Sequence, residues 1–222
     1  MRWLTCRTDD VPAGDGWLTP RERAVASGLH VPPRQASWRL GRWTAKALCG
    51  AGSEILAAGD GAPQLVGSPG SLSLSHRADR ALAVVDAERV VGCDLELVEP
   101  RSSGFVEDWL DPLERAELEE LEGDALALAV MLRWSAKEAA AKLRREGMRL
   151  DLRDAVVVVA PGRGEAWAPL AVRWGALGTI HGWWRRENEF VMTVVSDPAG
   201  PPPERAPAQT LWTGVRPVVG GE

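Results

Sequence analysis

The sequence contains few of the residues and runs that mark secreted or membrane proteins. It has three cysteines and no tyrosine among 222 residues. Cys6, Cys49 and Cys93 are odd in number and lack the spacing of metal ligands, so we expect free thiols in a reducing compartment, the cytoplasm. No run of 18 apolar residues occurs, and acidic residues follow the N-terminus closely. We therefore expect neither a membrane span nor a secretory signal peptide.

Lysine is also scarce, and the overall charge is negative. Only three of the 26 basic residues are lysines, at positions 46, 137 and 142, and the net charge is −5. An acidic chain is a poor candidate for a dedicated nucleic-acid surface. Two of the lysines fall in one short segment, which indicates a need for a compact point charge there rather than the planar fork of arginine.

That segment belongs to the strongest predicted helix, residues 124–146. It is rich in Ala, Leu, Arg and Glu and contains no proline. Trp134, Glu138 and Lys142 are spaced four apart, so they form one stripe on the helix surface. Glu138 and Lys142 could be an ordinary solvated ion pair, or the stripe could belong to a functional site.

A second helix is predicted over residues 34–48. Arg39, Arg42 and Lys46 fall at i, i+3 and i+7, which places three cations on one face. This face could be solvated, or it could cradle phosphate groups.

Three strands are predicted next. The alternating segment SLSLSH, ending at His76, is followed by residues 80–85 and 89–98, with short polar turns between them. We expect an antiparallel meander. On the third strand Asp94 and Glu96 project from the same face, roughly 7 Å apart at about 3.3 Å of rise per residue. Two acids on a half-buried strand call for a cation, unless the strand is a solvent-facing edge.

The second half of the chain repeats this order of elements. Asp111 and Pro112 predict the start of a helix to about residue 122, with Glu114 at the third position of a capping box. After the long helix come four strand candidates, at residues 155–160, 170–174, 179–185 and 189–196, and then a Pro-rich tail that we expect to be extended or disordered.

This repeated order predicts an α+β fold of two similar lobes related by a pseudo-two-fold axis. Each lobe would be a small antiparallel sheet packed with helices, and the active site would lie in the cleft between them. We expect an N-terminal lobe at residues 1–100, a C-terminal lobe at 101–197 and a tail at 198–222. In this arrangement Asp94 and Glu96 of the first lobe could face Glu138 of the second.

The candidate residues favour chemistry on phosphate esters. Three carboxylates suit Mg²⁺, which fills its octahedron with water and substrate phosphates. Nearby cations, with His76 at a strand end and Lys142 one turn after Glu138, indicate a substrate with several phosphates. The sequence has no nucleophile elbow, P-loop or dinucleotide-binding fingerprint.

The motifs SLSLSH, VGCDLE and WSAKEAAAK resemble, in this order and spacing, those of the 4′-phosphopantetheinyl transferases. The likeness is to the longer, monomeric type that activates peptide and polyketide synthases, and it spans roughly residues 30–145. WRLGRWTAK and GDGAP are also similar to family segments. The resemblance implies coenzyme A as co-substrate and an apo acyl or peptidyl carrier protein as partner. The 4′-phosphopantetheine arm would be transferred to a carrier serine, with release of 3′,5′-ADP, and no nucleic acid or membrane would take part.

The resemblance also implies roles for individual residues. Asp94, Glu96 and Glu138 would hold Mg²⁺, and Lys142 would stabilise and protonate the departing 3′,5′-ADP. The residues that would contact the phosphates of coenzyme A are Arg34, Arg42, His76 and Lys137.

Two further positions bear on the match. Glu114 aligns with a proposed base for the carrier serine, a role that competes with its capping role. Arg77 stands where the family has Ser or Thr.

Two other functions compete with this interpretation. A different Mg²⁺-dependent phosphodiesterase or nuclease could use the same acids, although the acidic net charge disfavours it. A non-catalytic binding protein could keep the fold, but it would not need an intact set of Asp94, Glu96, Glu138 and Lys142.

Overall fold

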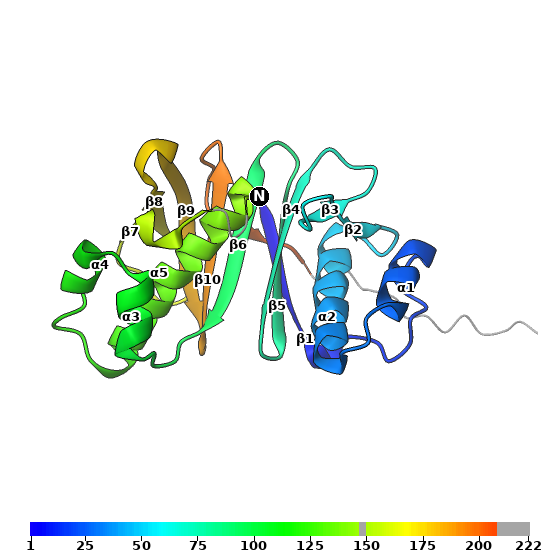
Figure 1. Ribbon diagram of the computed structural model, residues 1–222. Coiled ribbons are helices and arrows are strands. Elements are labelled where there is room, and N and C mark those ends of the chain that lie inside the picture. The colour runs from blue at the N-terminus through cyan, green and yellow to red at the C-terminus, as the bar shows by residue number, and fades with distance from the viewer. Residues whose placement is uncertain (147–149, 208–222) are drawn as a thin grey trace, which may run out of the picture.

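The computed structural model describes residues 1–146 and 150–207, which form a mixed α+β fold with antiparallel sheets (Figure 1). The helices are α1 (Pro20–Ser27), α2 (Pro32–Cys49), α3 (Ser103–Trp109), α4 (Pro112–Ala116) and α5 (Gly123–Arg144). Single 3-10 turns occupy Thr8–Asp10, Leu152–Asp154 and Gly175–Leu177.

The strands form two main sheets and one hairpin. The first sheet has the order β11-β1-β5-β4, with β1 (Arg2–Arg7), β4 (Ser71–Arg77), β5 (Arg80–Asp86) and β11 (Glu204–Arg205). The second has the order β6-β10-β9-β8-β7, with β6 (Val90–Leu97), β7 (Val156–Val159), β8 (Ala168–Arg173), β9 (Thr179–Glu187) and β10 (Phe190–Asp197). The hairpin joins β2 (Ile55–Ala57) to β3 (Pro63–Leu65).

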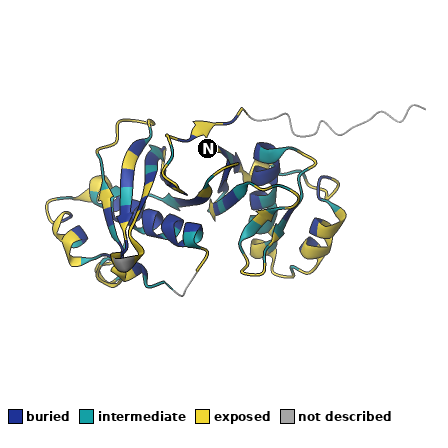
Figure 2. Cartoon of the chain, turned by 90° about the horizontal axis from the view of Figure 1, so that it is seen from above, coloured by how far each residue is buried: buried dark blue, intermediate teal, exposed yellow. Residues whose placement is uncertain are grey.

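Three hydrophobic clusters hold the layers together. One lies between α2 and the first sheet, and another lies between the second sheet and α5. The third joins the two sheets: Leu82 and Val84 of β5 meet Cys93 and Leu95 of β6 and Met192 of β10. The sheets thus pack face to face on the inside, with α2 and α5 on the outside. Figure 2 shows buried residues continuing from one half into the other.

The third strand of the expected meander belongs to the other sheet. β4 and β5 form the predicted hairpin, but β6 pairs with β10, with Asp94 opposite Thr193. β4 and β6 nevertheless lie side by side, joined by side chains rather than by a backbone ladder. Val91 N donates to Ser71 Oγ (3.1 Å) and Cys93 N donates to Ser73 Oγ (3.0 Å). Alternation predicted the strand correctly, but it cannot identify the partner strand.

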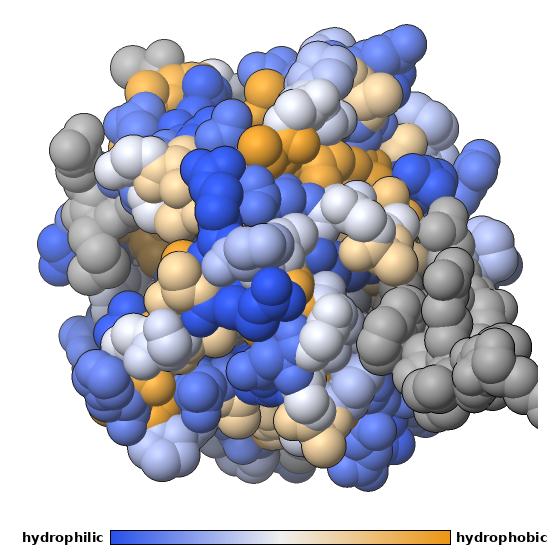
Figure 3. Space-filling view, turned by 90° about the vertical axis from the view of Figure 1, so that its right-hand side faces the viewer, coloured by the Kyte–Doolittle hydropathy of each residue, from blue (hydrophilic) through white to orange (hydrophobic). Residues whose placement is uncertain are grey.

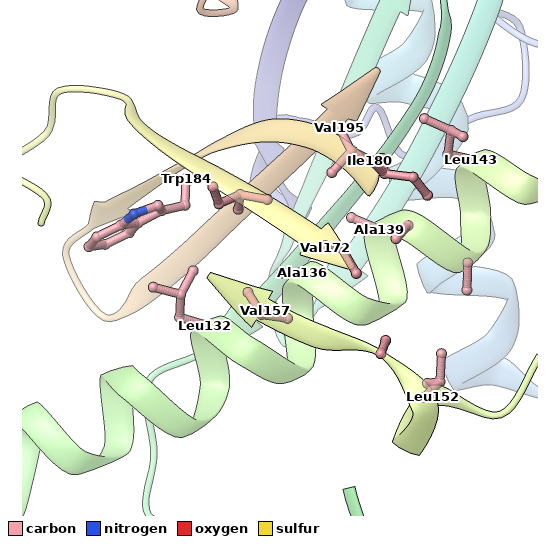
Figure 4. Close-up of a cluster of buried hydrophobic side chains, with 14 of the residues drawn as sticks. Leu132, Ala136, Ala139, Leu143, Leu152, Val157, Val172, Ile180, Trp184 and Val195 are labelled. Atoms are coloured by element: carbon pink, nitrogen blue, oxygen red, sulfur yellow. The ribbon is translucent and has the colours of Figure 1, made fainter. Parts of the chain in front are cut away.

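Helix α5 lies very close to β6 because of one glycine. A Cβ built on Gly92 would lie 2.0 Å from the carbonyl oxygen of Ala139, which no side chain permits. From α5, Leu132, Ala136 and Leu143 then pack on the second sheet (Figure 4). The small alanines and Gly92 therefore set the distance between the helix that carries Glu138 and the strand that carries Asp94.

The same helix-capping arrangement occurs near the start of each half of the chain. Thr19 caps α1 with Glu22 at the third position, and Asp111 caps α4 with Glu114. Each glutamate is fully buried and pairs with a lysine of the next long helix in its half, Glu22 with Lys46 at 2.8 Å and Glu114 with Lys137 at 2.7 Å.

The lysines end closely similar segments, RWTAK in α2 and RWSAK in α5, a repeat visible in the sequence itself. In each half the other carboxylate oxygen accepts a strand N–H, from Ile55 for Glu22 and from Val157 for Glu114, both at 2.8 Å. The relation of two lobes by a pseudo-two-fold axis, and their division at residue 100, stay predictions.

Several other predicted segments differ from the structure. The predicted helix 111–122 is confined to α4, and α3 was not predicted. Of the Pro-rich tail, Glu204–Arg205 pairs in parallel with β1, whereas residues 208–222 lie outside the described residues. The face that carries α1 is largely hydrophilic, with small hydrophobic patches (Figure 3). None of the helices in the described part of the chain has the length and apolarity that a membrane crossing requires.

Candidate functional site

Two adjoining cavities lie beside the β4–β6 seam, between α2 and α5. The smaller, about 670 Å³, is lined by charged and polar residues from both helices and both strands, among them Arg34, Arg42, Ser75, His76, Asp94, Glu96 and Lys142. The larger, about 1280 Å³, is lined in part by Trp109, Trp134, Glu138 and Lys142. Lys142 borders both cavities. Seven of the nine predicted site residues therefore line these cavities, all except Glu114 and Lys137.

Asp94 lines the smaller cavity and is almost completely buried. Its Oδ1 accepts hydrogen bonds from Lys142 Nζ (2.7 Å) and Ser75 Oγ (2.8 Å). Lys142 Nζ also donates to Ser75 Oγ (3.1 Å), which closes a triangle of three groups. The Asp94 charge raises the pKa of Lys142 even though burial opposes it, so the lysine is an ammonium ion at neutral pH.

Glu96 lies two residues further along the same face of β6, as predicted. Its Oε1 accepts a hydrogen bond from Trp134 Nε1 (3.3 Å), and its Oε2 lies 3.3 Å from Arg77 Nε. Burial raises the pKa of Glu96, and the nearby charge of Asp94 raises it further. Asp94 and Glu96 thus share one face of β6, where the charge of Asp94 makes ionisation of Glu96 less favourable.

Glu138, the third predicted acid, lines the larger cavity. It is half-buried on α5, one turn before Lys142. Burial raises the pKa of Glu138, and the charge of Asp94 adds to this effect. The predicted approach of the helix acid to the strand acids is therefore felt electrostatically, and Gly92 is the residue that permits it.

The carboxylate oxygens of this site are chemically suited to bind a divalent cation. Asp94 Oδ2 and Glu96 Oε2 are buried and have no hydrogen-bond partner, so each keeps lone pairs for a ligand. Hard carboxylate oxygens are the ligands that Mg²⁺ prefers. Within residues 1–146 and 150–207, however, no three His, Cys, Asp or Glu side chains are already arranged as a metal-binding cluster. In the structure each strand acid instead has one cation of the chain within ion-pair distance, Lys142 beside Asp94 and Arg77 beside Glu96.

The smaller cavity is also lined by two arginines and a histidine. Arg34 and His76 are exposed at its rim, and Arg42 is half-buried, with its guanidinium 4.9 Å from the Trp38 ring and its Nε donating to the Ile55 carbonyl (2.9 Å). The predicted stripe on α2 divides, because Arg39 turns away to pair with Asp15.

The third member of that stripe, Lys46, is buried against Glu22. Of the stripe, only Arg42 lines the cavity.

Glu114 and Lys137 lie away from both cavities. The Glu114 side chain is 1% exposed, and its carboxylate accepts hydrogen bonds from Lys137 Nζ (2.7 Å), Asp111 N (2.9 Å) and Val157 N (2.8 Å). All three hydrogen-bond donors to the Glu114 carboxylate come from residues that line neither cavity. This placement favours the capping role and argues against the predicted role as base, and it argues equally against contact between Lys137 and coenzyme A.

Two residues of the site were not assigned from the sequence. Ser75 was predicted only as the polar face of a strand, yet it contacts both Asp94 and Lys142. Arg77 was noted only as a departure from the family pattern, yet it contacts Glu96. The signal for both was their position beside His76, at the end of the strand that reaches the acids.

Comparison with known proteins agrees with the motifs. A search of curated proteins gave no match. Residues 90–194 match the family model of the 4′-phosphopantetheinyl transferase superfamily, a region that contains β6, α5 and therefore Asp94, Glu96, Glu138 and Lys142. This part of the chain is thus similar to the 4′-phosphopantetheinyl transferase superfamily.

Proposed function

We propose that the protein transfers the 4′-phosphopantetheine arm of coenzyme A to a serine of an apo acyl or peptidyl carrier protein. The reaction would depend on Mg²⁺ and release 3′,5′-ADP. We further propose that the chain is of the longer, two-lobe type that acts as a monomer. The family match over residues 90–194 supports the general activity. The acceptor, the metal and the roles of individual residues are our proposal.

One observation carries the proposal. The smaller cavity is lined both by carboxylates with an ammonium, Asp94, Glu96 and Lys142, and by two arginines with a histidine, Arg34, Arg42 and His76. Such a cavity suits a ligand that is both strongly anionic and bridged to a divalent cation. The diphosphate and 3′-phosphate of coenzyme A provide this combination.

Asp94, Glu96 and Glu138 would hold Mg²⁺. When bound, the ion would neutralise and orient the diphosphate. Arg34, Arg42 and His76 would bind the remaining phosphate charge. These residues position coenzyme A so that its pantetheine-bearing phosphorus faces the larger cavity, through which a carrier serine could approach.

In the transfer step the serine oxygen bonds to that phosphorus while the bond to the oxygen of 3′,5′-ADP breaks. Lys142, kept protonated by Asp94, stabilises the charge on the departing phosphate and can supply a proton. Glu138 lines the larger cavity, whereas the Glu114 carboxylate is buried and held by internal hydrogen bonds. We therefore assign the serine proton to Glu138 in place of Glu114.

The test is an incubation of the protein with coenzyme A, Mg²⁺ and a panel of apo acyl and peptidyl carrier proteins. Intact mass spectrometry should show the addition of one phosphopantetheinyl group to a carrier, and a carrier with its serine replaced by alanine should gain nothing. Cleavage of nucleic acid in the same buffer would instead favour a nuclease. No addition to any carrier would count against the proposal.

A further inference from the structure

Arg77 has two acidic partners, one of which belongs to the proposed metal site. Its Nε lies 3.3 Å from Glu96 Oε2, and its Nη2 lies 2.7 Å from Glu99 Oε1. Glu99 also contacts Arg101 (3.0 Å). The Arg77 side chain is 38% exposed, so it has room to move. Arg77 can therefore leave Glu96 without losing all of its carboxylate contacts.

The contact with Glu96 is the weaker of the two. Glu96 Oε2 lies within ion-pair distance of Arg77, yet it accepts no hydrogen bond from any group in the described residues. Glu96 Oε2 therefore keeps its lone pairs open to a better-placed cation.

Lys142 has the corresponding position on the other acid. Its Nζ lies 2.7 Å from Asp94 Oδ1, so each strand acid has one cation from the chain itself. Any divalent cation that binds these oxygens must compete with Lys142 and Arg77. A diphosphate would give both displaced cations a new anionic partner, and it would supply ligands to the metal as well.

We propose that Arg77 is a positioning residue that acts through Glu96 as a displaceable internal counter-ion. It weakens the binding of a divalent cation alone and thereby makes the cation and the diphosphate bind together. This inference rests on the proposed metal site. Because such coupling is reciprocal, coenzyme A would tighten metal binding by the same factor as the metal tightens coenzyme A binding.

The experiment is a titration of the full chain with Mn²⁺, followed by electron paramagnetic resonance of the free ion, with and without coenzyme A. In the wild type, coenzyme A should tighten Mn²⁺ binding by about tenfold or more, within the usual range of coupling between sites. Arg77→Gln should bind Mn²⁺ alone up to about fivefold more tightly, as expected for loss of a partly exposed ion pair. The factor by which coenzyme A tightens Mn²⁺ binding should be smaller in this variant than in the wild type.

Three further variants separate this role from a general effect on folding. Arg77→Lys keeps the charge and should resemble the wild type. Arg7→Gln removes a guanidinium from another exposed pair, Arg7 with Asp79 at 2.9 Å, and should change nothing. Glu99→Gln leaves Arg77 with Glu96 as its remaining carboxylate partner, so it should weaken binding of Mn²⁺ alone. Opposite shifts for Arg77→Gln and Glu99→Gln are hard to explain by destabilisation.

Unchanged Mn²⁺ affinity in folded Arg77→Gln, or no effect of coenzyme A on the wild type, would overturn the inference. Thermal unfolding curves establish that each variant is folded. The proposed transfer is judged separately, from the mass of the carrier protein. Coupled binding without transfer would reject the proposed function and leave the role of Arg77 standing, whereas transfer with uncoupled binding would do the reverse.

Discussion

Replacement of Glu114 by glutamine separates its two candidate roles. The side chains of Glu114 and Lys137 are 1% and 0% exposed and lie 2.7 Å apart. Removing one charge from a buried pair leaves the other uncompensated, at a cost of about 3–5 kcal/mol. At about 2–4 °C per kcal/mol for a chain of this size, the melting temperature should fall by roughly 6–20 °C. The double variant Glu114→Gln/Lys137→Met should regain most of this loss.

The first half of the chain supplies a matched control. Glu22 has the same capping position, burial and lysine partner, and it lines neither of the two cavities. Glu22→Gln should therefore lose similar stability. Assayed by carrier mass at a temperature where both are folded, both variants should transfer at nearly the wild-type rate. A general base typically raises the reaction rate by about 10²–10⁴-fold. If Glu114→Gln alone lost activity on that scale, the capping account would be refuted.

Four other predictions follow from the geometry. Gly92→Ala should unfold at lower temperature and lose transfer, because its Cβ meets the backbone of α5, whereas Gly59→Ala, with no heavy atom within 4 Å, should not. Asp94→Asn should abolish both transfer and Mn²⁺ binding, and retained transfer would exclude the metal assignment. The metal-free protein should lose stability as the pH rises from the ordinary glutamate pKa through the raised pKa values of folded Glu96 and Glu138, because burial makes their ionisation cost more in the folded state; denaturant unfolding measured across this pH range, with stability that does not fall, would contradict it. Burial raises the pKa of Cys6 to about 11 and that of Cys93 to about 12, so native protein should resist iodoacetamide at pH 8, and rapid alkylation of Cys93 would contradict its burial.

Much of the local structure could be predicted because its signals are local. The capping box at Asp111, the alternation before His76 and the long proline-free segment around Glu138 each specify an element within a few residues. The shared face of Asp94 and Glu96 followed from the period of a strand alone. The structure confirms that Cys93 and Leu95 face the opposite way, into the core between the sheets.

The pairing of β6 and the role of Glu114 depend on contacts between residues that are far apart in the sequence. Alternation on β6 is the same whether it pairs with β5 or β10, so its sheet could not be predicted. The capping box and the base motif both fit Glu114, and only the buried contacts with Lys137 and Val157 distinguish them. One signal in the sequence was missed: the paired RWTAK and RWSAK segments indicate that Lys46 and Lys137 have the same buried role.

The central claim is that acids from β6 and α5 hold one divalent ion against the diphosphate of coenzyme A. The most direct test measures ³¹P relaxation of coenzyme A in the presence of protein-bound Mn²⁺. The account predicts strong relaxation of the two diphosphate phosphorus atoms, weaker relaxation of the 3′-phosphate, and loss of both effects in Asp94→Asn. Equal relaxation of all three phosphorus atoms, or relaxation that survives in Asp94→Asn, would contradict it.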